Sequence, residues 1–141
     1  MAVLKSQRGE SVVQFLDTAR QLVMHTRRCC LKMPKRYTFF GAQMISALAD
    51  EVYNEARKGN SIFPSNAHEA QMRRDHFTAA NNALQALAGQ LEIMAEILRQ
   101  NPDCEKWLYK ALEKWGELIS SEAKMLSAIK KADKKKYQGL Q

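Results

Sequence analysis

The sequence predicts an all-α protein, an antiparallel up-down-up-down four-helix bundle. Apolar residues recur at steps of three and four along nearly the whole chain, and no stretch alternates with a period of two. Three prolines, Pro34, Pro64 and Pro102, divide the 141 residues into four segments of similar length, and proline interrupts helices. A chain of this length forms one domain, so we expect a single bundle over residues 1–141.

The first two helices are predicted over residues 10–33 and 37–59. In the first, apolar residues recur every three or four positions from Val12 to Met33, which creates one face that can enter a core. The second continues the same period. The Gly-Asn pair that begins at Gly59 is typical of a helix C-terminus, so we expect the second helix to end there.

The last two helices are predicted over residues 66–100 and 102–133. Asn66, with a glutamate three residues later, resembles a capping box that opens the third helix. Asn101 followed by proline is a typical N-cap and first-turn pair for the fourth helix. After that helix we expect residues 134–141 to form a frayed basic tail.

Positive charge is clustered along the chain rather than spread evenly. The chain has 22 Lys and Arg against 15 Asp and Glu, a formal net charge of +7. No acidic residue lies between Asp17 and Asp50, and lysine dominates the chain after Lys124, whereas residues 88–123 carry more acids than bases. A bundle of the predicted topology gathers these bases at its two ends.

Clustered arginine and lysine side chains suit a polyanionic partner, because they pair with phosphates and release bound counterions. We therefore expect a nucleic-acid-binding surface. Its expected residues are Arg27, Arg28, Lys32, Lys35, Arg36, Arg73, Arg74, Lys130, Lys131, Lys134, Lys135 and Lys136. The alternative is that these basic helix ends are only solvated and stabilise the C-terminal helix dipoles.

Cysteine usage and hydropathy exclude several classes of protein. The three cysteines are odd in number, and the adjacent Cys29 and Cys30 diverge on a helix, so a disulfide framework is not expected. The first residues lack the apolar run of a signal peptide, and no apolar stretch reaches the roughly 18 residues of a membrane span. We expect a soluble, cytoplasmic protein with no membrane partner.

One pair of residues has the spacing of metal ligands. His25 and Cys29 lie four residues apart, but no second pair complements them and both follow the apolar period, so we interpret them as core residues. A di-metal carboxylate site requires Glu-x-x-His on two helices, which this sequence lacks. The common phosphate-loop, nucleophile-elbow and metalloprotease motifs are missing as well. We therefore expect a non-enzymatic protein with no catalytic residue, metal or cofactor.

Aromatic residues beside the bases have two interpretations. Tyr37 and Phe39 closely follow basic residues, and rings in such positions stack on nucleobases in single-strand binders. The predicted second helix also needs apolar side chains on its inner face, so we expect both rings to face the core. Trp107 and Trp115, on the fourth helix, are expected in the core or at a subunit interface.

Three segments of the chain carry a family resemblance. They are Pro34-Lys-Arg-Tyr-Thr-Phe-Phe with Gln43, Ala47-Leu-Ala and Ala56; Arg73-Arg-Asp-His-Phe-Thr-Ala-Ala with Leu84, Leu87 and Gln90-Leu; and Leu126-Ser-Ala-Ile-Lys-Lys-Ala-Asp133. In helix phasing and in these dispersed residues, residues 10–137 resemble the four-helix-bundle proteins encoded in ribosomal-RNA intervening sequences. That superfamily includes the accessory variability determinants of diversity-generating retroelements, and the chain looks closer to this retroelement branch.

The resemblance implies an accessory protein rather than a catalyst. Proteins of the retroelement branch form basic pentamers that bind nucleic acid and associate with a reverse transcriptase during mutagenic copying of a template RNA. For this chain it implies a homopentamer that binds RNA, DNA or an RNA–DNA hybrid beside a reverse transcriptase, encoded by a bacterium or a phage. The positions carried over from matching helices are Arg27, Arg28, Lys32, Lys35, Arg36, Arg73 and Arg74. The alternative is an intervening-sequence-type structural or interaction protein without specific nucleic-acid binding.

Overall fold

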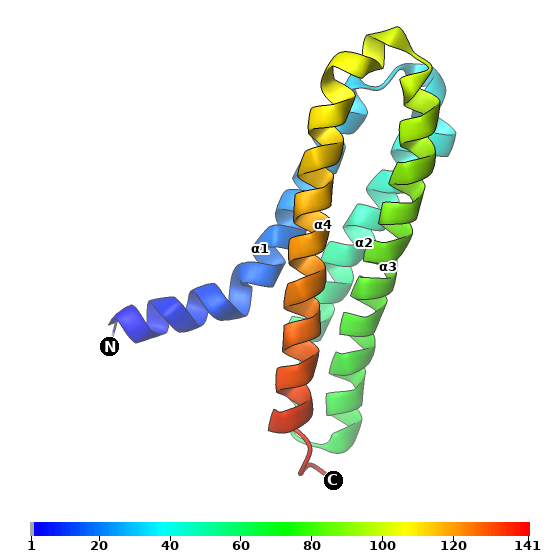
Figure 1. The fold of residues 1–141 in the computed structure, drawn as a ribbon. Coiled ribbons are helices and arrows are strands. Elements are labelled where there is room, and N and C mark those ends of the chain that lie inside the picture. Colours follow the sequence, from blue (N-terminus) through cyan, green and yellow to red (C-terminus); the bar gives the residue numbers. More distant parts are fainter. Residues whose placement is uncertain (1) are drawn as a thin grey trace.

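The computed structural model describes the backbone of residues 2–141 and the side chains of residues 13–104 and 106–141. Within this range every regular element is helical, which confirms the predicted all-α class (Figure 1). The long helices are α1 (Ala2–Lys32), α2 (Gln43–Asn60), α3 (Ala67–Arg99) and α4 (Pro102–Lys136). The later part of α1 lies side by side with the other three helices, whereas its first part projects away from them (Figure 1). Helices α1 and α3 each pack against both α2 and α4.

Short connections define two ends of this helical body. At one end, which we call the turn end, residues 33–42 join α1 to α2 and residues 100–101 join α3 to α4 (Figure 1). At the opposite end, the tail end, residues 61–66 join α2 to α3 beside the last residues of the chain. There the carbonyl oxygen of Gln141 accepts a hydrogen bond from the N–H of Ala67 at 3.3 Å.

The two predicted N-caps of α3 and α4 are confirmed. The side chain of Asn66 accepts a hydrogen bond from the backbone N–H of Glu69 at 2.8 Å, and the carboxylate of Glu69 accepts one from the N–H of Ser65. The side chain of Asn101 accepts a hydrogen bond from the N–H of Asp103 at 3.0 Å, with Pro102 in the first turn. Each cap satisfies backbone donors that a helix start leaves unpaired.

The connection between α1 and α2 is more structured than the sequence predicted. A 3₁₀ turn (η1, Lys35–Tyr37) and a π-helical turn (η2, Thr38–Ala42) precede α2, which therefore begins at Gln43 rather than at residue 37. The backbone of Pro34 is extended, with φ −58° and ψ 145°, so the chain leaves α1 there and then winds gradually back into a helix.

Other predicted helix boundaries were also wrong. Helix α1 begins at Ala2, and α4 continues to Lys136, so three lysines of the expected tail belong to a helix. Lysine favours helices and is stabilised by the dipole at their C-termini, which explains the extension of α4. Helix α2 ends at Asn60, within one residue of the predicted boundary, although no glycine among the described residues has the positive φ of a glycine C-cap.

The core consists of two apolar clusters. The larger one lies in the middle and at the turn end, and it includes the fully buried side chains of Leu22, Ile45, Leu84 and Trp115. The smaller one lies toward the tail end; its buried members are Phe15, Ala56, Phe77, Ala80 and Leu126. The fully buried Glu122 follows Leu118 of the larger cluster and precedes Leu126 of the smaller one along α4.

Candidate nucleic-acid interface

A basic groove of about 380 Å³ lies between α3 and α4 at the tail end. It is lined by Arg74, Asn81, Ala123, Leu126, Ser127, Lys130, Lys131 and Lys134. Four of these eight residues are cationic, and no carboxylate lines the groove among the described side chains. The groove therefore offers a site where phosphates would face cations from two helices.

Helix geometry places these cations together. Lys130, Lys131 and Lys134 lie within about one turn of α4, and side chains three or four residues apart share one helix face. Arg74 projects from the facing helix α3. The ammonium of Lys130 donates a hydrogen bond to the hydroxyl of Thr78 at 2.9 Å, which fixes one cation at the seam of the two helices.

Arg73, although adjacent to Arg74, points into the protein. Its guanidinium donates to the carboxylate of Asp133 at 2.7 Å and to the backbone carbonyls of Gly59 and Ile62 at 3.3 and 3.0 Å. It also lies over the ring of Phe77, 4.9 Å from the centroid, and only 12% of its side chain is exposed. Arg73 thus joins α3, α4 and the 61–66 connection.

The remaining predicted cations at the tail end are exposed. Lys135 and Lys136 lie in the last turn of α4 outside the groove, and the ammonium of Lys136 lies 5.4 Å from the ring centroid of Tyr137. They add positive charge near the groove without lining it. The tail end therefore holds six accessible or partly accessible cations of the predicted set and one, Arg73, that serves as an internal connector.

The other five predicted cations lie at or near the turn end, far along the helices from the groove. Arg27 forms an exposed ion pair with Asp50 at 3.0 Å. Lys32 lies over the ring of Trp107, with its ammonium 6.0 Å from the centroid, and Arg36 lies over Tyr37 at 5.2 Å. The other two of these five cations, Arg28 and Lys35, have exposed side chains. The structure therefore divides the predicted surface between two separate ends.

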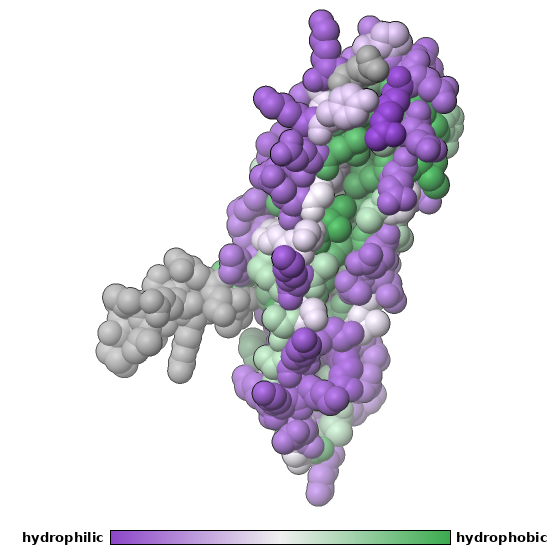
Figure 2. Space-filling view, viewed as in Figure 1, coloured by the Kyte–Doolittle hydropathy of each residue, from purple (hydrophilic) through white to green (hydrophobic). Residues whose placement is uncertain are grey.

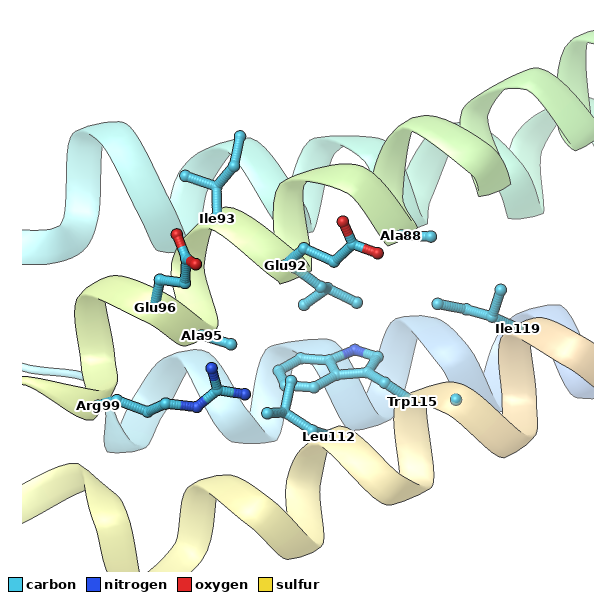
Figure 3. A pocket seen from close by; sticks show the side chains of 11 residues that line it. Ala88, Glu92, Ile93, Ala95, Glu96, Arg99, Leu112, Trp115 and Ile119 are labelled. Atoms are coloured by element: carbon cyan, nitrogen blue, oxygen red, sulfur yellow. The ribbon is translucent and has the colours of Figure 1, made fainter.

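Between the two ends, an apolar groove of about 570 Å³ opens between α3 and α4 (Figure 3). Its floor includes Trp115 and Leu112 of α4, while Glu92, Glu96 and Arg99 of α3 lie along it. Figure 2 shows the corresponding hydrophobic strip between the two helices, with hydrophilic residues below it toward the tail end. The α3–α4 face thus changes from acidic and apolar to basic along its length.

Two aromatic residues that were predicted to face the core are more exposed than expected. Phe39 is 82% exposed, so its assignment to the core was wrong, and Tyr37 is only partly buried. The π-helical turn changes the phase of the helix at this point, and the simple helical period does not anticipate that change. Trp115 is buried as expected, whereas Trp107 is partly exposed.

Asn81 and Ser127 line the groove although the sequence did not predict them there, and the burial of Glu122 was not predicted either. Both carboxylate oxygens of Glu122 lack a hydrogen-bond partner among the described residues, and burial raises its pKa to about 8. A signal was present, because Glu122 falls on the same helical period as Trp115 and Leu118. No comparable sequence signal distinguishes Asn81 or Ser127.

His25 and Cys29 lie together as the sequence suggested. Their closest nitrogen and sulfur atoms are 3.6 Å apart, and His25 Nε2 is 3.0 Å from the carbonyl oxygen of Ala111. Burial lowers the pKa of His25 and raises the pKa of the Cys29 thiol to about 11. Within the described part of the chain, no three His, Cys, Asp or Glu side chains converge on a common point.

Comparison with known proteins adds no assignment: the chain matches no protein-family model, no curated protein and no solved structure. None of the helices in the described residues combines the length and apolarity that crossing a membrane requires. The candidate interface therefore depends on the geometry and charge of this chain's own residues.

Proposed function

We propose that this chain is a non-enzymatic nucleic-acid-binding protein whose basic groove holds phosphates. The observation that carries the proposal is the convergence of Arg74, Lys130, Lys131 and Lys134 from two helices on one groove without a lining carboxylate among the described side chains. Like charges held this close repel one another, and a bound polyanion relieves that repulsion. The alternative, that these lysines are only solvated, does not account for their convergence with an arginine from another helix.

Within this proposal, the chain is an accessory subunit of a diversity-generating retroelement that binds RNA, DNA or a hybrid and docks a reverse transcriptase. Its resemblance to that group supports this role. The proposal includes an up-down-up-down bundle that assembles as a homo-oligomer, with a pentamer as the expected form.

A structural or interaction role without nucleic-acid binding is the second candidate. The apolar groove lined by Trp115, Leu112 and Ile119 favours it, because exposed apolar concavities of this kind accommodate protein side chains. The acidic Glu92 and Glu96 beside that groove would repel nucleic acid. The two candidates therefore assign different functions to two parts of the same α3–α4 face.

A charge-reversal experiment separates them. The double variant Arg74→Glu, Lys131→Glu is compared with Lys114→Glu, Lys124→Glu, a control in the middle part of α4 outside the groove. Each double variant lowers the formal net charge from +7 to +3. Binding of a labelled mixed-sequence RNA is measured by fluorescence anisotropy at several salt concentrations, and circular dichroism verifies the fold.

We expect the groove variant to weaken binding much more than the control. It should also reduce the slope of log affinity against log salt by about 0.7–0.9 for each phosphate that the protein no longer neutralises. Equal weakening in both variants would indicate attraction to net charge alone and would reject the groove. No binding by the wild-type chain at low salt would reject nucleic-acid binding and favour the interaction role.

A further inference from the structure

Two phenylalanine rings are exposed at the turn end. Phe39 is 82% exposed and Phe40 is 61% exposed, and both belong to the π-helical turn η2. Large apolar side chains exposed together at one site are uncommon on a soluble protein unless they contact a ligand. The basic groove lies at the opposite end of the helices, so it does not account for the exposure of these rings.

Packing of the π-helical turn directs these rings outward. Gly41 is the buried residue of the turn, and a Cβ atom at this position would lie 2.8 Å from the terminal methyl of Met94 on α3. The turn therefore places its glycine against α3 and leaves Phe39 and Phe40 outside. Phe40 packs edge-on against Tyr37, with ring centroids 6.2 Å apart and an interplanar angle of 88°, so a neighbouring ring supports it.

Four cations precede the rings along the chain. Lys32, Lys35 and Arg36 are exposed within seven residues of Phe39, and Arg28 is exposed one turn earlier on α1. None of these four forms an ion pair with a carboxylate among the described side chains, whereas nearby Arg27 is paired with Asp50. Exposed rings and cations without a carboxylate partner among the described side chains thus occur together at this end.

We infer that the turn end is a binding site for single-stranded nucleic acid, in which unpaired bases stack on Phe39 and Phe40 while the neighbouring cations contact phosphates. A single strand offers flat apolar base faces and negative charge together, which matches both features of the site. A duplex hides its base faces, so it would use only the cations. This inference rests on the proposed nucleic-acid-binding function and specifies its substrate class.

The test compares an unstructured 20-nucleotide single strand with a duplex of the same length in fluorescence-anisotropy titrations. The variant is Phe39→Ala, Phe40→Ala. The matched control is Phe63→Ala, which removes a phenylalanine that is also 82% exposed but lies in the 61–66 connection at the tail end. A second variant, Phe39→Trp, Phe40→Trp, keeps a stacking surface at both positions. Circular dichroism and light scattering monitor folding and oligomeric state.

We expect the double alanine variant to lose about tenfold or more of its single-strand affinity, since each stacked base contributes substantially. Duplex affinity and the salt slope should change little, and both Phe63→Ala and the double tryptophan variant should retain single-strand affinity. Loss of affinity for both nucleic acids alike, or for neither, would overturn the inference.

Other outcomes separate this inference from the proposed function. A change in the oligomeric state of the double alanine variant, measured by light scattering, would overturn the inference, because it would assign the rings to contacts between copies of the chain. Wild-type binding of duplex but not of single strand would overturn this inference alone. Binding of neither nucleic acid by the wild-type chain would reject the proposed function together with it.

Discussion

The indole N–H of Trp115 donates a hydrogen bond to the hydroxyl of Thr26 at 2.9 Å, and both side chains are buried between α4 and α1. The Thr26 hydroxyl in turn donates to the carbonyl oxygen of Leu22 at 2.8 Å. The Trp115 ring also meets the ring of His25 edge-on, with centroids 4.8 Å apart. This chain of contacts links two helices that are far apart in sequence.

Replacing Thr26 by valine should lower the free energy of unfolding by about 1–3 kcal/mol, because the buried indole N–H loses its acceptor while the side-chain volume is kept. Chemical denaturation followed by tryptophan fluorescence and circular dichroism measures this change. Thr18→Val is the matched control, since Thr18 is buried on the same helix but is not the hydrogen-bond acceptor of the Trp115 indole. A loss as large in the control would contradict the assigned role of the bond.

Glu122 should make the stability of the protein depend on pH. Burial raises the pKa of this carboxyl from 4.5 to about 8, so the folded state holds its proton more tightly than the unfolded state does. Proton binding by Glu122 therefore stabilises the folded state fully below pH 4.5, and this stabilisation is lost as pH rises through about 8. Its upper limit is on the order of 5 kcal/mol.

Denaturation of wild type and Glu122→Gln at several pH values between about 5 and 9 isolates this effect, because other titrating groups cancel in the difference. We expect the wild type to lose stability relative to the variant as pH rises. Glu122→Met should be more stable than the wild type at about pH 8, since it removes a buried polar group without a described partner. A pH-independent difference would mean that Glu122 does not titrate in this range.

Gly59 allows α2 and α3 to approach closely. A Cβ atom at this position would lie 2.6 Å from the ring of Phe77, so Gly59→Ala should destabilise the protein by about 1–3 kcal/mol through overpacking. At Gly89 and Gly116, by contrast, an added Cβ meets no atom within 4 Å. Alanine there should raise stability by up to about 1 kcal/mol each through helix propensity. Thermal unfolding of the three variants compares the signs, and a stabilised Gly59→Ala would refute the packing argument.

Alanine substitutions of the neighbouring Arg73 and Arg74 should have different effects on stability and on RNA binding. Arg73→Ala leaves Asp133 and two backbone carbonyls without their donor, so we expect a loss of about 2–3 kcal/mol in stability. Arg74→Ala should change stability by less than about 0.5 kcal/mol and should weaken RNA binding. Parallel denaturation and anisotropy measurements test the separation; an unchanged stability of Arg73→Ala would contradict it.

Much of the helical architecture could be predicted because its signals are local. The caps at Asn66 and Asn101 follow from residue types at fixed spacings, and the long helices follow from apolar periodicity. The separation of cations into two ends also follows from the order of the segments. These features do not depend on the details of side-chain packing.

The parts that could not be predicted depend on packing between helices. Consecutive residues on a helix point about 100° apart, so only the position of α4 determines that Arg73 faces inward and Arg74 outward. The exposure of Phe39 depends on a π-helical turn that packs Gly41 against Met94, a contact far apart in sequence. Glu122 lies on the same helical period as the apolar residues of α4, so its burial could have been predicted. A charged residue on an apolar face, however, conflicts with the usual pattern.

The length of α4 sets a minimum size for any ligand that reaches both basic ends. Lys32 lies over Trp107 near the start of this helix, and Lys130 lies in the groove near its end. At about 1.5 Å per residue, the segment 107–130 spans roughly 35 Å, which equals about ten base pairs at about 3.4 Å each. Oligonucleotides shorter than this can occupy only one end of a protomer, so affinity should rise abruptly once their contour length exceeds that span.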